Sequence, residues 1–128
     1  MVTAAQIVVL LVEDNEESIV TVADYLQFKD FQVFIARTGR EALDIVSDAQ
    51  PDIILMDIQM PEMDGLEAIR RFKDMPDLAR TPIIALTALA MAGDRERCMA
   101  AGFDDFLAKP FALAEAEASV RRWVTPGG

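Results

Sequence analysis

Short apolar segments alternate with longer polar or amphipathic segments along the chain. The apolar segments hold three to six residues and are rich in Val, Ile, Leu and Phe, which favours strands over helices. Most are continuous rather than alternating, as expected for a parallel sheet that is covered on both faces. They predict five strands, at Ile7–Val12, Phe31–Ala36, Ile53–Met56, Pro82–Leu86 and Phe106–Ala108.

The segments between these strands carry apolar residues at helical spacing. The first follows a polar start at Asn15–Ser18, and its apolar positions recur on one helical face. The second begins with Thr38 and Glu41, spaced as a capping box, and the third begins with Asp64 as its N-cap. The positions expected to face the core are Ile19, Val22, Ala23 and Leu26, then Ala42, Ile45, Val46 and Ala49, then Leu66, Ile69 and Phe72.

Two further helices complete the alternation. The fourth spans residues 90–101 approximately, has a weak apolar stripe with Gly93 inside it, and ends at Gly102, a favourable C-cap. The fifth starts after Pro110, with its inward positions at Leu113, Ala116, Val120 and Val124. Strands that alternate with helices predict an α/β fold, and five strands fit an open, doubly wound (βα)5 parallel sheet rather than a barrel.

Length and composition narrow the class of protein. With 128 residues, 52% of them hydrophobic, the chain is expected to form one domain over residues 1–128, with a core at about 7–124 and a disordered tail at 125–128. A net charge of −10 disfavours binding to nucleic acid or to an anionic membrane. The longest apolar run is too short to span a membrane and no basic leader precedes it, so the expected location is cytoplasmic.

The cysteine and histidine counts exclude several chemistries. A single cysteine, Cys98, cannot form an intramolecular disulfide, and without histidine there is no Cys/His zinc site. Hydrolases that depend on a Ser–His or Cys–His pair are excluded as well. Any chemistry must therefore use carboxylates, hydroxyls, lysine and hard metal ions.

Candidate functional side chains stand at the ends of the predicted strands, where open α/β folds bind their ligands. Glu13 and Asp14 follow the first strand, Asp57 ends the third, Thr87 follows the fourth and Lys109 follows the fifth. If the first and third strands are neighbours, three carboxylates share a small space and repel one another unless a cation is present. Oxygen ligands without Cys or His select a hard cation, and Mg²⁺ is the leading candidate.

The same set of residues suits a phosphoryl group, whose transfer depends on positioning and charge neutralisation. An aspartate can itself be the nucleophile and form an acyl phosphate. Taken singly, each residue has an ordinary structural explanation: an acidic pair is common in surface loops, and a threonine can cap a helix. Their joint placement at strand ends favours the functional interpretation.

Four segments resemble the receiver domain of two-component response regulators, and the resemblance covers nearly the whole chain. They are Leu11–Asn15 (LVEDN), Met56–Gly65 (MDIQMPEMDG), Leu86–Ala88 (LTA) and Asp105–Pro110 (DFLAKP). The resemblance implies a flavodoxin-like fold with strand order 2-1-3-4-5. It also implies that Asp57 accepts a phosphoryl group from the phosphohistidine of a histidine kinase, with Mg²⁺ as cofactor.

The resemblance also assigns the remaining roles. Thr87 and Lys109 would bind the phosphoryl oxygens, and Phe106 would be an aromatic switch at a position that is often tyrosine. Phosphorylation would then change the surface of the fourth helix, fifth strand and fifth helix, for binding a downstream protein or for phosphorelay through a phosphotransfer protein. The residues implied to hold Mg²⁺ are Glu13, Asp14, Asp57 and, through its backbone carbonyl, Gln59.

Other functions stay open from the residues alone. A flavodoxin-type electron carrier shares the fold, but its first loop must cradle a phosphate, which the acidic segment 13–17 would repel. A phosphatase with an aspartate nucleophile would want a second acid where Gln59 stands, and a purely structural interaction domain would respond to neither Mg²⁺ nor a phosphodonor. Within the receiver family, the chain fits a free-standing regulator, with no output domain after Val124, or a receiver from a hybrid sensor kinase. In neither case is catalysis expected beyond its own phosphorylation and dephosphorylation.

Overall fold

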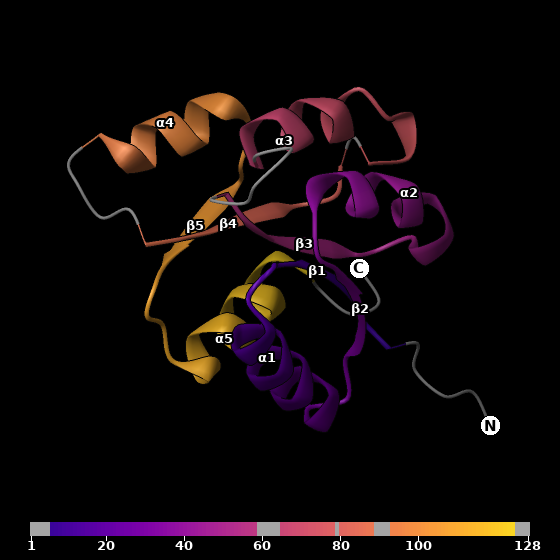
Figure 1. The fold of residues 1–128 in the computed structure, drawn as a ribbon, viewed down its shortest axis with the longest axis vertical. Helices are drawn as coiled ribbons and strands as arrows, with labels where there is room; N and C mark the ends of the chain where they lie inside the picture. The colour runs from indigo at the N-terminus through magenta and orange to yellow at the C-terminus, as the bar shows by residue number, and fades with distance from the viewer. Residues whose placement is uncertain (1–5, 59–64, 79, 89–92, 125–128) are drawn as a thin grey trace.

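Five strands alternate with five helices in the computed structural model, which describes residues 6–58, 65–78, 80–88 and 93–124 (Figure 1). The strands are β1 (Val8–Val12), β2 (Gln32–Ala36), β3 (Ile53–Asp57), β4 (Ile83–Thr87) and β5 (Asp105–Ala108). The helices are α1 (Glu16–Phe28), α2 (Gly39–Ala49), α3 (Gly65–Lys73), α4 (Asp94–Ala101) and α5 (Leu113–Trp123), with a short 3₁₀-helix η1 (Pro76–Leu78). None of the described helices has the length and apolar character needed to cross a bilayer.

The strands form one parallel sheet in the order β2-β1-β3-β4-β5, which confirms the expected fold and strand order. The register places Asp57 opposite Leu86, and Thr87 opposite Ala108. Because all strands run the same way, their carboxyl ends meet at one edge of the sheet and their amino ends at the other. These two edges are called the carboxyl end and the amino end below.

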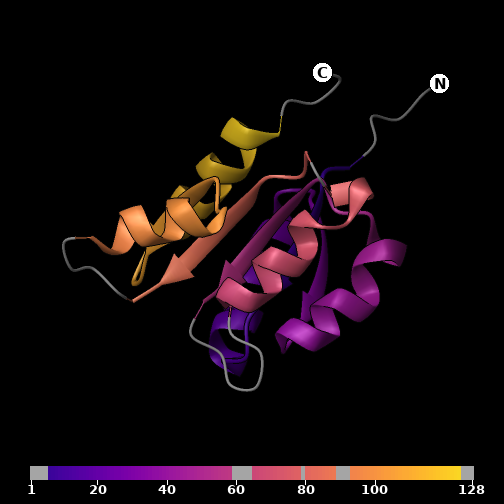
Figure 2. The ribbon, with the colours of Figure 1, turned by 90° about the horizontal axis from the view of Figure 1, so that it is seen from above.

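Helices cover both faces of the sheet. Helices α1 and α5 lie on one face, and α2, α3 and α4 lie on the other (Figures 1 and 2). Successive residues of β1 enter different clusters: Val9 and Leu11 pack with α1 and α5, whereas Leu10 and Val12 pack toward α2 and α3. The apolar runs in the sequence are continuous because side chains of both parities are buried.

Most positions predicted to face the core are buried. Ile45, Leu113 and Val124 are half-buried, while Asp64, the side chain of Leu66 and the tail at 125–128 lie outside the described part of the chain. The predicted core positions that the structure buries are Ile19, Val22, Ala23, Leu26, Ala42, Val46, Ala49, Ile69, Phe72, Ala116 and Val120.

The start of α4 corrects the sequence-based expectation. The helix begins at Asp94, so Gly93 precedes it rather than lying inside it. Gly93 has φ of +93°, a left-handed conformation that glycine adopts without strain and that is incompatible with a helix interior. At the other end the prediction is confirmed: Gly102 has φ of +116° and donates its N–H to the Met99 carbonyl at 3.1 Å.

Candidate functional site

Four of the predicted site residues come together at the carboxyl end of the sheet. Asp57 is the last residue of β3, as predicted, whereas Thr87 is the last residue of β4 and so stands inside its strand rather than just after it. Glu13 directly follows β1, and Lys109 directly follows β5. The parallel arrangement brings these four positions together although they are distant in sequence.

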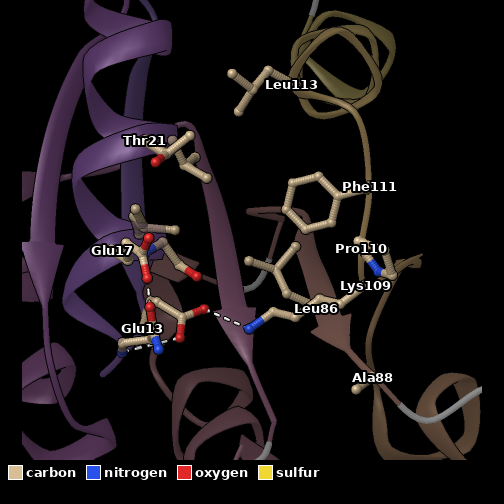
Figure 3. Close-up of a pocket in the computed structure, with 13 residues that line it drawn as sticks. Glu13, Glu17, Thr21, Leu86, Ala88, Lys109, Pro110, Phe111 and Leu113 are labelled. Carbon is tan, nitrogen blue, oxygen red and sulfur yellow. Dashed lines mark hydrogen bonds and ion pairs between the residues drawn. The ribbon is translucent and has the colours of Figure 1, made fainter.

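Lys109 joins two of the carboxylates. Its Nζ donates to Glu13 Oε2 at 2.8 Å and to Asp57 Oδ2 at 3.1 Å, and Figure 3 shows the lysine extended toward Glu13. Glu13 and Asp57 are 2% and 5% exposed, so the ion pairs lie largely out of water. The lysine thus already compensates part of the repulsion that the sequence led us to expect between the carboxylates.

The buried position shifts the pKa values of two of these groups. Burial raises the pKa of the Glu13 carboxyl above its ordinary value, and the charge of Asp57 acts in the same direction, against the hydrogen bond from Lys109. Burial alone would lower the pKa of Lys109, but the hydrogen bonds and charges of Glu13 and Asp57 outweigh it and raise the pKa. Lys109 therefore stays protonated near neutral pH.

Glu13, Asp14 and Asp57 have the composition and spacing of a site for a hard cation. One oxygen from each carboxylate lies within 4.8 Å of the other two, and Asp14 is the exposed member of the set. An all-oxygen donor set with an open, solvent-facing side fits Mg²⁺, which keeps several water ligands in proteins. With Lys109 positive and three carboxylates negative, the site has a net charge of −2 in the absence of a metal, which attracts a divalent cation. Gln59, the fourth expected ligand, lies outside the described residues.

The acidic loop after β1 is anchored to the end of β2. The Glu13 N–H donates to the Ala36 carbonyl at 3.0 Å, and Glu13 Oε1 accepts from the Asn15 N–H at 3.2 Å. Asn15 also caps α1, as its side chain accepts from the Ser18 N–H at 2.9 Å. These bonds fix the backbone that carries Asp14.

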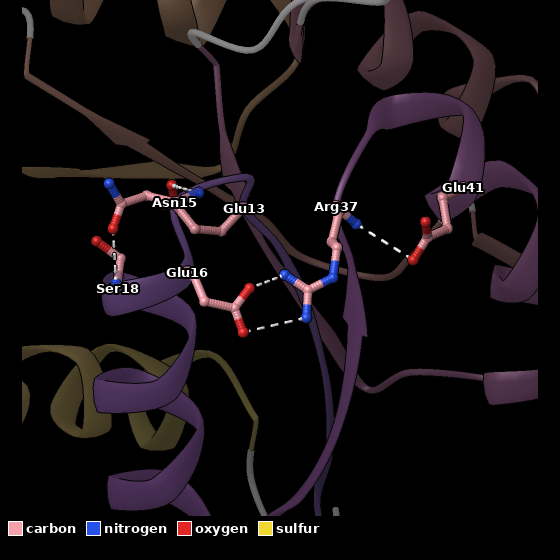
Figure 4. Close-up of polar contacts among 6 residues, drawn as sticks. All are labelled: Glu13, Asn15, Glu16, Ser18, Arg37 and Glu41. Carbon is pink, nitrogen blue, oxygen red and sulfur yellow. Dashed lines mark hydrogen bonds and ion pairs between the residues drawn. The ribbon is translucent and has the colours of Figure 1, made fainter.

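Arg37 adds a second anchor that the sequence analysis did not identify. Its guanidinium forms a two-pronged ion pair with the carboxylate of Glu16, the first residue of α1, and its backbone N–H donates to Glu41 at 3.3 Å (Figure 4). The predicted capping bond from the Glu41 N–H to Thr38 Oγ1 is present at 3.0 Å. Arg37 directly follows β2, so the strand-end rule used for the other residues would have found it.

Thr87 and Phe106 occupy adjoining strands. Thr87 is fully buried, and its carbonyl accepts from the Lys109 N–H at 2.7 Å, so the two predicted phosphoryl ligands are linked through the backbone. Phe106 is half-buried and packs against the cluster on the α2, α3 and α4 face of the sheet. It lies opposite Ala85 of β4, two positions before Thr87.

A cleft opens beside the ion pairs. It has a volume of about 580 Å³ and runs between α1 and the segment that joins β5 to α5 (Figure 3). Glu13 and Lys109 stand at its polar end, and its apolar wall is formed by Leu11, Val22, Leu86, Phe111 and Leu113. The sequence analysis did not predict this cleft, because its walls come from segments about a hundred residues apart.

Comparison with known proteins decides the family. The model of the response regulator receiver domain family matches residues 9–121. The chain belongs to the response regulator receiver family. The match confirms the resemblance noted in the sequence over nearly the whole chain. Receiver domains are signalling modules.

Three known proteins place this receiver among its relatives. It is 41% identical over 105 residues to the polar-differentiation response regulator DivK of Brucella ovis, covering 82% of this chain and 85% of DivK. The receiver domain of sensor histidine kinase PA1611 from Pseudomonas aeruginosa PAO1, with a magnesium ion coordinated in its active site cleft, is 39% identical with a TM-score of 0.85, over 93% of this chain and 98% of that domain. A chain from the complex of the Saccharomyces cerevisiae phosphotransfer protein Ypd1 with the receiver domain of Ssk1 is 27% identical with a TM-score of 0.85, over 94% and 90%.

Proposed function

We propose that this receiver accepts a phosphoryl group on Asp57 from the phosphohistidine of a histidine kinase or phosphotransfer protein, with Mg²⁺ as cofactor. The observation that carries the proposal is Lys109 Nζ bonded to both Glu13 and Asp57 at the carboxyl end of the sheet. These bonds join two carboxylates and a cation in one hydrogen-bonded group, which supports Asp57 as the nucleophile. The acidic trio supports the cofactor assignment.

The transfer is a displacement at phosphorus. A carboxylate oxygen of Asp57 attacks the phosphorus atom, the new P–O bond forms, and the P–N bond to the donor histidine breaks. The imidazole nitrogen keeps the electron pair of the broken bond and takes up a proton from solvent. The Lys109 ammonium group then binds one phosphoryl oxygen, and the Thr87 hydroxyl donates a hydrogen bond to another phosphoryl oxygen.

Mg²⁺, when bound by Glu13, Asp14, Asp57 and the Gln59 carbonyl, would neutralise the charge that otherwise keeps an anionic donor away. Asp57 is held in place by the end of β3, and Lys109 by its backbone bond to Thr87. The sheet therefore holds the backbone of both residues, and the response to the phosphoryl group falls on the side chains.

The proposed output is a change in the surface formed by α4, β5 and α5. A phosphoryl group on Asp57 draws Thr87 and Lys109 toward it, and Phe106 on β5 moves into the vacated space. The proposal rests on the backbone link between Thr87 and Lys109 and on the half-buried position of Phe106. Hydrogen exchange with and without a phosphoryl mimic should then change most between residues 86 and 111, and a uniform change would contradict the switch.

The test of the phosphorylation site is labelling with a small acyl-phosphate donor and Mg²⁺, followed by mapping of the modified residue. Wild type and the matched control Asp44→Asn, an exposed acid on α2, should label equally. Asp57→Asn should not label, and excess chelator should abolish labelling of wild type and Asp44→Asn. Labelling of Asp57→Asn at the wild-type level would overturn the site, and labelling in chelator would overturn the metal.

We take residues 7–124 as the functional unit, and we propose no catalysis beyond its own phosphorylation and dephosphorylation. We further propose that it acts in the cytoplasm and that its partner is a downstream protein. The likeness to DivK supports a self-contained regulator. The likeness to the receiver of a sensor histidine kinase supports the second candidate, a receiver within a hybrid kinase. Phosphotransfer profiling tests the two candidates. Fastest transfer from a kinase that shares one chain with this receiver supports the hybrid, and fastest transfer from a separate kinase or phosphotransfer protein supports the self-contained regulator.

A further inference from the structure

A second cavity lies at the amino end of the sheet, opposite the proposed phosphorylation site. It has a volume of about 190 Å³ and shares no residue with the cleft beside Glu13 and Lys109. Its walls come from the end of α3, the residues just before β4 and β5, and the end of α5. The residues that form it are Lys73, Arg80, Thr81, Pro82, Asp104 and Trp123.

Among the described residues that line this cavity, two are cations, Lys73 and Arg80, and one is a carboxylate, Asp104. Lys73 Nζ lies 3.8 Å from Asp104 Oδ2, which is beyond hydrogen-bond length, and that same oxygen already accepts from the Ile83 N–H at 2.8 Å. Arg80 is exposed and has neither an ion pair nor a side-chain hydrogen bond to another residue in the described part of the chain. Both cations therefore have N–H donors available to a ligand.

The excess of positive charge is unusual for this chain. The protein carries 22 acidic and 12 basic residues, so a cavity with more cations than carboxylates runs against its overall charge of −10. Lys73 alone could be explained by the favourable position of a cation in the last turn of a helix. Arg80 lies outside every helix, between η1 and β4, so helix electrostatics do not explain it.

Trp123 supplies a flat apolar wall. Its indole Nε1 donates to Asp105 Oδ2 at 3.1 Å, and Arg122 lies 3.6 Å from the same oxygen. The ring is therefore held in place, yet the residue is 39% exposed. A fixed, partly exposed ring beside two cations can bind the organic part of a ligand while the cations bind its charge.

We propose that this cavity binds a small phosphate monoester. The phosphate lies between Lys73 and Arg80, with the Thr81 hydroxyl as a further donor, and the organic body lies against the indole of Trp123. The volume is below the range of about 300–1,000 Å³ for drug-sized ligands, so a phosphate with a body about the size of a pentose fits better than a dinucleotide. The site is separate from Asp57 and independent of the proposed phosphotransfer.

The chain contains a single tryptophan, which gives a local readout. Ribose 5-phosphate, inorganic phosphate and ribose are each titrated at constant ionic strength, in chelator, so that the carboxyl end repels anions. Trp123 fluorescence and the indole N–H signal in a nitrogen-15 NMR spectrum follow binding, and calorimetry measures it independently of the ring. We expect saturable binding of ribose 5-phosphate, weaker binding of inorganic phosphate and none of ribose.

Matched charge variants test the assignment. Arg80→Gln and Lys73→Gln should each weaken ribose 5-phosphate binding about tenfold or more, because each removes a charged donor. Arg40→Gln, an exposed arginine on α2 at the other end of the sheet, removes the same charge and should bind like wild type. All three substitutions are at partly or fully exposed positions, so unfolding does not confound the comparison.

Three results would overturn the proposal. The first is a lack of ribose 5-phosphate binding in calorimetry, which would remove the site. The ligand is tested at 10 times the highest protein concentration and up to about 10 mM, a range that covers weak sites. Equal weakening in Arg80→Gln and Arg40→Gln would show that only net charge matters. Equal affinity for inorganic phosphate and ribose 5-phosphate would overturn the role given to Trp123.

Discussion

The two ends of the sheet hold charge in opposite ways. At the carboxyl end, Lys109 bonds to two carboxylates whose side chains are only 2% and 8% exposed, those of Glu13 and Asp57. At the amino end, Lys73 lies 3.8 Å from Asp104, and both side chains are 32% exposed. The lysines themselves differ little, at 25% and 32% exposed, so the difference lies in the carboxylates.

Burial of the carboxylates decides what each end can do. A buried carboxylate must have a partner, so Glu13 and Asp57 hold Lys109 between them. An exposed carboxylate is hydrated and places little demand on its neighbour. Lys73 and Arg80 are therefore available to a ligand from solution, whereas Lys109 is engaged within the protein.

Removal of the lysine at each end should give the largest contrast. Without metal, Lys109→Met removes the cation that bonds to two buried carboxylates, and we expect the free energy of unfolding to fall by about 3 kcal/mol. Lys73→Met breaks only an exposed, long ion pair and should cost less than about 1 kcal/mol. Urea denaturation in chelator measures both, and equal losses would contradict the difference in burial.

The metal response should depend on the carboxyl end alone. At a Mg²⁺ concentration of 100 times Kd, linkage stabilises the wild type by about 2.7 kcal/mol. Asp57→Asn removes a charged ligand but keeps an oxygen that can accept from Lys109, so we expect little change without metal and a Mg²⁺ increment smaller by about 1.4 kcal/mol, for a tenfold loss of affinity.

The controls for this experiment must separate Mg²⁺ binding at the acidic trio from general electrostatic screening. Ionic strength is held constant, because added salt also screens a net charge of −10. Asp44→Asn removes the same charge from the exposed side of α2 and should keep the full Mg²⁺ increment. If Mg²⁺ stabilises Asp57→Asn as much as wild type, the ion acts by screening and the acidic trio is not its site.

Substitution of Arg37 should have the smallest effect, a change in Mg²⁺ affinity whose direction is informative. If its ion pair with Glu16 holds the loop that carries Asp14, Arg37→Gln should weaken Mg²⁺ binding about two- to fivefold, within the range for an exposed ion pair. Loss of a nearby positive charge by itself would strengthen Mg²⁺ binding. Calorimetry of Mg²⁺ against Arg37→Gln and Arg40→Gln separates the two, since tighter binding in Arg37→Gln would contradict the anchoring role.

Local pattern was sufficient for the elements of the fold but not for all of their ends. Apolar runs placed the five strands, and the spacing of Val22 and Leu26 placed the buried face of α1, because these signals depend on neighbouring residues. The predicted start of α4 was wrong, since the sequence does not reveal whether a glycine within a weak apolar stripe has a positive φ. Thr87 was assigned to the position after its strand because a polar residue ends an apolar run without ending the hydrogen-bonded ladder.

The sequence by itself determined the alternation of strands and helices, the acidic and basic residues available for chemistry, and their positions at strand ends. The tertiary structure decided which of these residues touch. Lys109 meets Glu13 across 96 residues and Asp57 across 52, and the amino-end cavity joins α3 to α5, so neither contact leaves a periodic signal in the chain. Such contacts depend on sheet register and side-chain rotamers, which are set by packing of the whole domain rather than by the local sequence.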